Sequence, residues 1–178
     1  MKNKKYEFTG ETMEWCGHTL HRIRAIVDIA YAKAGEVGGW IESESNLSEA
    51  GNAWVCGNAK VFGNAKVFGN AEVFGNAEVF GDAEVFGNAE VCGNAKVFGN
   101  AEVKQPSDYI VVKNCWSSMR WFTYTRSNKK WAVGCFYGTG EELIKKAYAD
   151  SETSGKCYEA IVRAVEAIEE ATKKESVK

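Results

Sequence analysis

Residues 61–79 read VFGNAKVFGNAEVFGNAEV, in which the six-residue unit VFGNAx occurs three times in succession. From Gly51 to Val103 the frame G-N-A-x-V-x continues, with Asp82 in place of one Asn. Six residues is not the period of a helix, whereas short repeats of fixed length indicate units that stack on their neighbours. The repeat therefore decides the fold of the middle of the chain.

Each unit combines an extended segment with a corner. In Ala-x-Val, the two apolar side chains point to one face of the segment, and the residue between them points to the other. Gly and Asn then supply the residues that most readily adopt left-handed backbone conformations, so each unit ends in a corner. A single unit cannot bury its apolar face, and we predict a solenoid whose interior is lined by Ala and Val.

This alternation resembles the hexapeptide-repeat family of left-handed β-helix proteins, in which three six-residue faces make one triangular coil. The match runs from Val61 and Ala65 to Val97 and Ala101 and covers about a third of the chain. It departs from the family pattern in one respect, because Phe stands where the family usually has a small residue. The resemblance implies a mostly β protein with a left-handed parallel β-helix of about three coils over residues 51–103.

A coil of 18 residues also gives a sensible arrangement of charge. The outward side chains then stack in three columns: Lys60, Glu78 and Lys96; Lys66, Glu84 and Glu102; Trp54, Glu72 and Glu90. Unlike charges meet in most steps of these columns, as cross-strand pairing favours, and the third column keeps one repulsive step. The charge pattern therefore supports the 18-residue coil.

The same register stacks the aromatic residues at the corners. One corner carries Phe62, Phe80 and Phe98, the second carries Phe68 and Phe86, and the third carries Phe74 between Cys56 and Cys92. Two interpretations remain open. The stacked rings shield the corner backbone, or they form an apolar strip that contacts a second copy of the chain or a foreign partner.

The segments on either side of the repeat have other patterns. Residues 1–50 predict an N-terminal β cap, with a hairpin that turns at Cys16-Gly17-His18, because an open solenoid end exposes unpaired strand edges and core. We assign Trp15, Trp40 and Ile41 to plugging that end.

Residues 104–178 predict a C-terminal α+β domain. Alternating strands flank a Ser-Asn-Lys-Lys turn, and a short helix follows from Gly140 to Asp150, with Thr139 or Gly140 as its N-cap. A longer helix follows, with Ser154 as its expected N-cap.

One stretch of the C-terminal domain interleaves cations with aromatic rings. We single out seven residues there as a partner-binding face: Arg120, Trp121, Tyr124, Arg126, Lys129, Lys130 and Trp131. Such a face can stack nucleic-acid bases or contact a protein. The alternative is that most of these rings belong to the core, because half of each alternating strand must face the helices.

The composition excludes several other classes. Lys and Arg number 22 against 24 for Asp and Glu, so net charge indicates neither a polyanion mimic nor an evident nucleic-acid binder. The six Cys form no CxxC pair and are expected to be reduced thiols, and two His are too few for the usual zinc site. We therefore expect no metal, no cofactor and, since no apolar run has the length of a membrane span, no membrane association.

Many proteins of the hexapeptide-repeat family are acyltransferases that use a His as general base. Here only His18 and His21 are available, both before the repeat, and they are more simply read as surface residues. The carbonic-anhydrase branch of the family needs three His ligands and does not fit.

The whole arrangement, from GEVGGWIESESNLSEAGNAWV to KKWAVGCFYGTGEELIKKAYADS, also resembles a group of phage and prophage proteins from gut bacteria. That resemblance implies a viral or mobile-element origin. Our leading hypothesis is a non-enzymatic, anti-CRISPR-like inhibitor in the host cytoplasm, which binds a CRISPR-type or other host protein complex, with or without nucleic acid. The alternatives are a divergent acyltransferase and a structural protein that self-assembles as a homo-oligomer through its Phe ladders.

Overall fold

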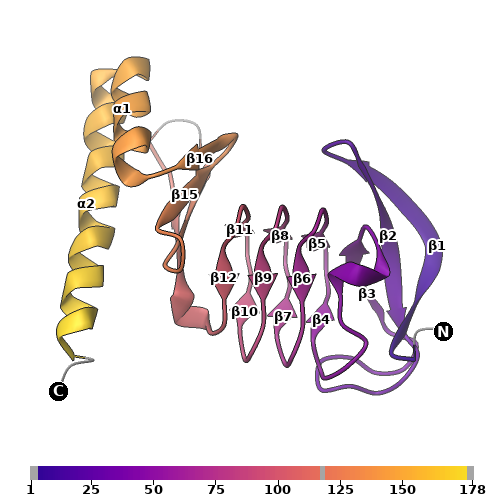
Figure 1. Cartoon of the computed structure of the whole chain (residues 1–178). Coiled ribbons are helices and arrows are strands. Elements are labelled where there is room, and N and C mark those ends of the chain that lie inside the picture. Colours follow the sequence, from indigo (N-terminus) through magenta and orange to yellow (C-terminus); the bar gives the residue numbers. More distant parts are fainter. Residues whose placement is uncertain (1–3, 117–118, 176–178) are drawn as a thin grey trace.

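The computed structural model describes residues 4–116 and 119–175. It is mostly β, with 37% strand and 23% helix, and its centre is a β-solenoid of about 4 turns. An antiparallel hairpin lies at the N-terminal end of the solenoid, and a small sheet with two helices lies at the other (Figure 1). This confirms the expected mostly β fold, with a parallel β-helix followed by an α+β segment.

The repeat forms nine two-residue strands, one on each face of each coil. They are β4 (Trp54–Val55), β5 (Lys60–Val61), β6 (Lys66–Val67), β7 (Glu72–Val73), β8 (Glu78–Val79), β9 (Glu84–Val85), β10 (Glu90–Val91), β11 (Lys96–Val97) and β12 (Glu102–Val103). All pairings among them are parallel, and Val61 lies opposite Val79, which confirms the 18-residue coil. Every Ala and Val of the frame is buried.

The corners and the charge columns follow from this register. The corner glycines from Gly57 to Gly99 have φ between 63° and 74°, a region that other residues rarely adopt. Lys96 Nζ lies 2.9 Å from Glu78 Oε2, and unlike charges meet in the same way in the neighbouring column. Glu72 lies opposite Glu90, and its pKa is raised, first by burial and further by this like charge.

The N-terminal segment contributes more to the solenoid than the sequence predicts. Strand β1 (Tyr6–Trp15) and strand β2 (His18–Ala25) form the expected hairpin. Strand β3 (Val37–Ile41) then pairs in parallel with β5, and after the short helix η1 (Glu44–Asn46), Leu47 bridges Val67. These residues build a further turn, which is why about 4 turns replace the expected three.

The end of the core is closed by aliphatic and aromatic side chains, but not by all those we assigned to it. Ile41 is fully buried there, as expected, together with Leu47 and Tyr6. Trp40 lies opposite Lys60 and therefore outside the prism, and Lys60 Nζ lies 4.3 Å from the ring centroid of Trp15. The assignment of these two Trp to the plug was wrong, because the register of Trp40 and the contact of Trp15 with Lys60 place both on the outside of the prism, at a charge column.

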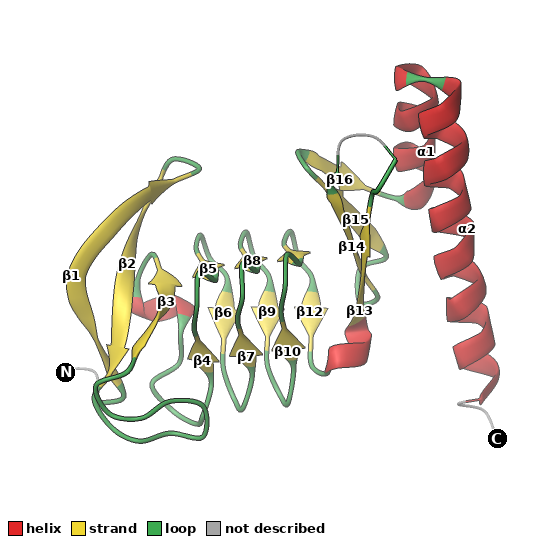
Figure 2. Cartoon of the chain, turned by 180° about the vertical axis from the view of Figure 1, so that it is seen from behind, coloured by secondary structure: helices red, strands yellow, loops and turns green. Residues whose placement is uncertain are grey.

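The C-terminal segment forms a sheet covered by two helices (Figure 2). The sheet contains, in order, β13 (Tyr109–Lys113), β14 (Trp121–Thr125), β15 (Lys130–Val133) and β16 (Phe136–Gly138), after the short helix η2 (Pro106–Asp108). The helices are α1 (Gly140–Asp150) and α2 (Glu152–Glu175). Helix α2 begins two residues before the predicted N-cap Ser154, whose backbone N–H instead donates to Ser151 Oγ at 3.1 Å.

The two faces of this sheet have different partners. Tyr109 and Val111 pack against the end of the solenoid core. Phe122, Trp131 and Val133 pack on the other side with the apolar residues of α1 and α2. The sheet therefore separates the solenoid from the helices and touches both.

Backbone hydrogen bonds link each coil of the solenoid to the next. Many backbone N–H groups of a coil donate to a carbonyl of the coil that follows, as Trp54 N does to Ala71 O and Lys60 N does to Ala77 O. The first repeat coil therefore has carbonyl oxygens, such as Ala53 O, that bond to the N-terminal cap, and the last coil has N–H groups, such as Lys96 N, that bond to the C-terminal cap. Each end needs side-chain partners for these groups.

The N-terminal cap supplies donors to the carbonyl oxygens. Asn46 Nδ2 donates to Gly63 O at 3.0 Å and to Ala65 O at 2.9 Å. Lys5 Nζ donates to Ala53 O at 2.8 Å.

The C-terminal cap supplies hydroxyl and carboxylate acceptors. These bonds are Cys92 N to the Tyr109 hydroxyl (3.3 Å), Lys96 N to Thr123 Oγ1 (2.9 Å), Glu102 N to Ser127 Oγ (2.8 Å) and Lys104 N to Asp108 Oδ2 (2.8 Å).

Candidate binding pocket on the C-terminal domain

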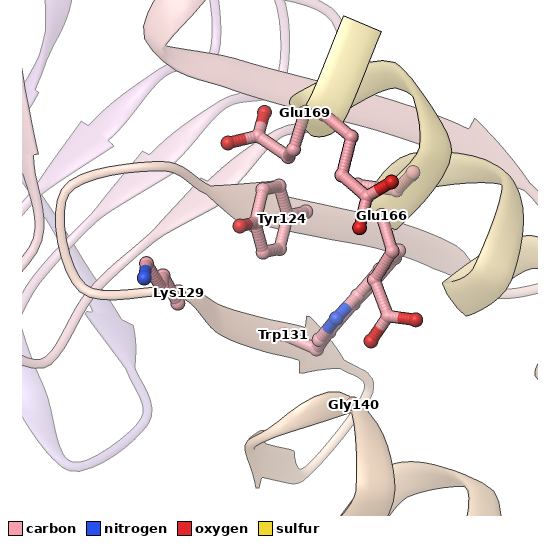
Figure 3. Close-up of a pocket in the computed structure, with 8 residues that line it drawn as sticks. Tyr124, Lys129, Trp131, Gly140, Glu166 and Glu169 are labelled. Atoms are coloured by element: carbon pink, nitrogen blue, oxygen red, sulfur yellow. The ribbon is translucent and has the colours of Figure 1, made fainter. Parts of the chain in front are cut away.

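A pocket of about 270 Å³ lies between the β14–β15 hairpin and α2 (Figure 3). Tyr124 and Trp131 contribute its aromatic surface from the sheet. Three carboxylates come from α2, and Lys129 comes from the hairpin turn. The pocket thus combines aromatic rings with charge, in the domain where the sequence predicts a partner-binding face.

The aromatic residues owe their position to strand alternation. In β14, Phe122 and Tyr124 point to the helices, and Tyr124 lies 5.1 Å from Trp131 between ring centroids. Both rings are more than nine-tenths buried, with exposed fractions of 7% and 2%. Within the described part of the chain, neither the Tyr124 hydroxyl nor the Trp131 indole N–H makes a hydrogen bond. Burial, and then Glu169, raise the pKa of Tyr124.

Three glutamates of α2 form the acidic wall of the pocket, and helical spacing explains why they lie together. Glu166, Glu169 and Glu170 stand at i, i+3 and i+4 in α2, and therefore lie on one face of the helix. Glu169 Oε1 lies 3.1 Å from Arg126 Nε, and Glu166 Oε2 accepts a hydrogen bond from Arg163 at 2.9 Å. Glu170 makes no ion pair with any described residue.

The start of α1 closes one side of the pocket. A side chain at Gly140 would place its Cβ 2.6 Å from Val162 Cγ1 and 3.4 Å from Trp131 Nε1. Glycine therefore allows the two helices to approach each other and leaves the indole N–H accessible. Of the two predicted N-caps, Thr139 is the one the structure shows, and it accepts a hydrogen bond from Glu142 N at 3.3 Å.

The structure brings together three of the seven residues that the sequence singles out. Tyr124, Lys129 and Trp131 line the pocket, and Arg126 contacts it through Glu169.

The remaining three lie elsewhere. Trp121 is on the opposite face of the sheet, 36% exposed, with Lys113 Nζ 5.6 Å from its ring centroid. Arg120 packs against Gly134, and Lys130 is half-buried at the start of β15. The sequence interpretation missed the carboxylates of α2, although their spacing was a signal that could have found them.

The corner Phe residues form the stacks that their register predicts. Ring centroids are separated by 4.9 Å between Phe62 and Phe80, 4.5 Å between Phe80 and Phe98, and 5.0 Å between Phe68 and Phe86.

The ends of the first stack are covered. His18 lies over Phe62 at 5.0 Å, and Tyr137 lies over Phe98 at 4.2 Å. Phe62 is buried, and the other corner rings are half-buried, including Phe74. The first ladder therefore connects the two caps.

The two histidines lie in the N-terminal hairpin. His18 Nδ1 lies 2.9 Å from Glu42 Oε1, and Glu42 Oε2 accepts a hydrogen bond from Gly63 N at 2.7 Å. Both bonds lower the pKa of Glu42, the bond from His18 contributing most. His21 packs against Phe8, with 4.9 Å between ring centroids.

All six cysteines are free, as expected. In the described part of the chain, no three His, Cys, Asp or Glu side chains are grouped so that they could hold a metal ion. Neither described helix combines the length and apolar composition needed to cross a membrane. No protein-family model matches the chain, and no curated protein matches its sequence.

Proposed function

We propose that this protein is a non-enzymatic, phage-type binding protein that inhibits a bacterial defence system by occupying a surface of one of its protein complexes. The observation that carries the proposal is the pocket on the C-terminal domain. It presents unpartnered donors on buried aromatic residues, and it contains three residues of the basic and aromatic stretch. The resemblance of the whole chain to phage and prophage proteins supports the choice of a CRISPR-type or similar host complex as the partner.

The solenoid supports this proposal as a rigid mount for the pocket. Lys96 N and Glu102 N bond to side chains of the C-terminal domain, and Phe98 stacks on Tyr137. These contacts fix the orientation of the domain before binding, which reduces the entropy that association must overcome. The 18-residue coil and its Ala and Val lining support assignment to the hexapeptide-repeat, left-handed type that the sequence resembles.

The test is protection of a phage from a defended host. Cells that carry an active CRISPR-type system against a phage would express the full-length protein, and the efficiency of plating of that phage would be measured. We expect plating to rise by orders of magnitude with the wild type. The double variant Tyr124→Phe/Glu170→Gln should lose most of this protection, because it alters the pocket while keeping the size of both side chains.

A matched control is Lys156→Ser, at an exposed position of α2 that pairs with Glu152, away from the pocket. This variant should protect as well as the wild type. Absence of protection across a panel of defence systems, with the protein folded and expressed, would contradict the proposed function.

One observation favours a second candidate, a divergent acyltransferase. The Glu42 carboxylate holds the His18 imidazole at Nδ1, which is the orientation that leaves Nε2 available as a general base. Release of free thiol from acetyl-CoA in the presence of acceptor alcohols and amines would test it. Turnover that disappears in His18→Ala and persists in His21→Ala would establish this activity in place of the binding function.

A further inference from the structure

We infer that the pocket between the β14–β15 hairpin and α2 binds the side chain of an arginine from a protein partner. The inference rests on the proposed binding function and names the chemistry of the group recognised. It follows from three properties of the pocket: the sign of its charge, its aromatic surface, and the two donors that have no partner within the described residues.

The net negative charge of the residues that line the pocket favours a cation as the ligand. Three carboxylates line the pocket against one ammonium group, that of Lys129. Two of the carboxylates already have arginine partners within the chain, since Glu169 pairs with Arg126 and Glu166 pairs with Arg163. Glu170 is left without an ion pair among the described residues, and it is the group that an incoming guanidinium can meet. A phosphate in the same place would face three carboxylates.

The aromatic surface selects a flat cation over a compact one. Tyr124 and Trp131 line the pocket, and a planar guanidinium can contact the exposed parts of such rings while its N–H groups point toward carboxylates. A lysine ammonium would gain the charge attraction but not the planar contact. The chain already pairs arginine with aromatic rings elsewhere, because the Arg22 guanidinium lies 4.9 Å from the Trp40 ring centroid.

The unpartnered donors indicate that the ligand also carries an acceptor. The Trp131 indole can only donate, and the Tyr124 hydroxyl can donate or accept. Gly140 leaves the indole N–H accessible from the pocket, so an acceptor on the ligand can bond to it. The carbonyl oxygens next to an arginine in a peptide meet this need, whereas a free inorganic cation does not.

The size of the pocket agrees with a single side chain. Its volume of about 270 Å³ lies below the roughly 300–1,000 Å³ usual for sites that enclose a whole small molecule. The pocket therefore suits one anchoring residue in a larger protein contact, which is how interfaces concentrate their binding energy.

The experiment titrates the full-length protein with N-acetyl-arginine methylamide and follows the tryptophan resonances by NMR. The matched probe is N-acetyl-citrulline methylamide, which has the same shape without the charge. We expect saturable binding of the arginine probe, with the indole N–H of Trp131 shifted, at least tenfold weaker binding of the citrulline probe, and intermediate binding of the lysine analogue.

Two variants test the named groups. Glu170→Gln should weaken the arginine probe at least threefold, whereas Glu152→Gln, at an exposed site of α2 away from the pocket, should leave it unchanged. Tyr124→Phe provides a second pocket variant that retains the ring. Equal binding of the arginine and citrulline probes, no saturable binding, or preferential binding of phosphate would overturn the inference.

The outcomes separate this inference from the proposed function. Failure of the arginine probe together with intact phage protection would refute the pocket chemistry and leave the binding function standing. Saturable probe binding together with no protection would refute the function and leave the pocket chemistry standing.

Discussion

The two ends of the solenoid have backbone groups that bond to different kinds of side chain in their caps. At the N-terminal end, the first coil offers carbonyl oxygens, and the cap answers with donors such as the Asn46 amide and the Lys5 ammonium. At the C-terminal end, the last coil offers N–H groups, and the cap answers with acceptors such as Thr123 and Tyr109. Donors in the N-terminal cap and acceptors in the C-terminal cap therefore satisfy these backbone groups at the two ends.

The two caps also differ in the structure that they add to the solenoid. The N-terminal hairpin continues one face of the solenoid in a six-stranded sheet, and Tyr6 and Leu47 pack into the core. The C-terminal sheet uses one face to seal the solenoid, through Tyr109 and Val111, and its other face to hold α1, α2 and the pocket. The C-terminal cap therefore carries the pocket proposed to bind a partner in addition to closing the solenoid.

The largest effect is expected at the donor end. Asn46→Ala removes two donations to backbone carbonyls and one bond accepted from Ser43 N, all at a fully buried position. We expect the free energy of unfolding in urea to fall by about 3 kcal/mol. Asn58→Ala, at an exposed corner, should cost less than about 1 kcal/mol. Equal losses for the two would contradict the role given to the donor cap.

The acceptor end should respond next. Thr123→Val keeps the shape of the side chain and leaves Lys96 N without its acceptor, at a position that is 1% exposed. The expected loss is about 2 kcal/mol, the cost of an unsatisfied buried donor. Thr12→Val, on the exposed hairpin, is the matched control, and the measurement is again unfolding in urea. If Thr123→Val leaves the free energy of unfolding unchanged, the Thr123 hydroxyl does not contribute to the cap.

The donor end should also carry a pH dependence. Burial lowers the pKa of Lys5 to about 8, against 10.5 for an ordinary lysine. Between these values the unfolded chain binds more protons, so stability due to this group rises with pH across that window, by an amount on the order of 1 kcal/mol. The free energy of unfolding of the wild type minus that of Lys5→Met should therefore be larger at pH 10.5 than at pH 7.5. A constant difference would refute this reading.

The smallest effect is expected at the exposed margin of the acceptor end. Ser127 accepts from Glu102 N at 2.8 Å, but it is exposed, and water can replace its hydroxyl. Ser127→Ala should therefore cost about 0.5 kcal/mol or less. A loss as large as that of Thr123→Val would mean that burial does not set the strength of the cap.

The solenoid was predictable because its signal repeats. Each coil places Val over Val 18 residues later, so the inward lining, the charge columns and the Phe stacks all follow from one period. The turn formed by residues 37–50 breaks that period: Ile41 pairs with Val61, 20 residues on, and its strand contains two glycines in place of the frame. That turn was therefore read as an irregular leader.

The caps and the pocket were less predictable because they depend on single contacts. Nothing in the spacing of Thr123 or Ser127 indicates that their hydroxyls accept bonds from distant backbone groups. The aromatic half of the pocket was visible in the alternation around Tyr124 and Trp131. The acidic half was not predicted, because the sequence interpretation of α2 considered only its apolar positions. The glutamates that give the pocket its charge were therefore overlooked.

The most direct test of the account compares the two ends as binding surfaces. Immobilised full-length protein would be exposed to nuclease-treated lysate from bacteria with an active CRISPR-type system, beside the pocket variant Tyr124→Phe/Glu170→Gln. The exposed N-terminal variant Glu7→Gln/Arg24→Gln serves as the control, since it removes an exposed ion pair. We expect stoichiometric capture of a host complex by the wild type and the N-terminal variant, and its loss with the pocket variant. Capture that survives the pocket variant and fails with the N-terminal one would contradict this expectation.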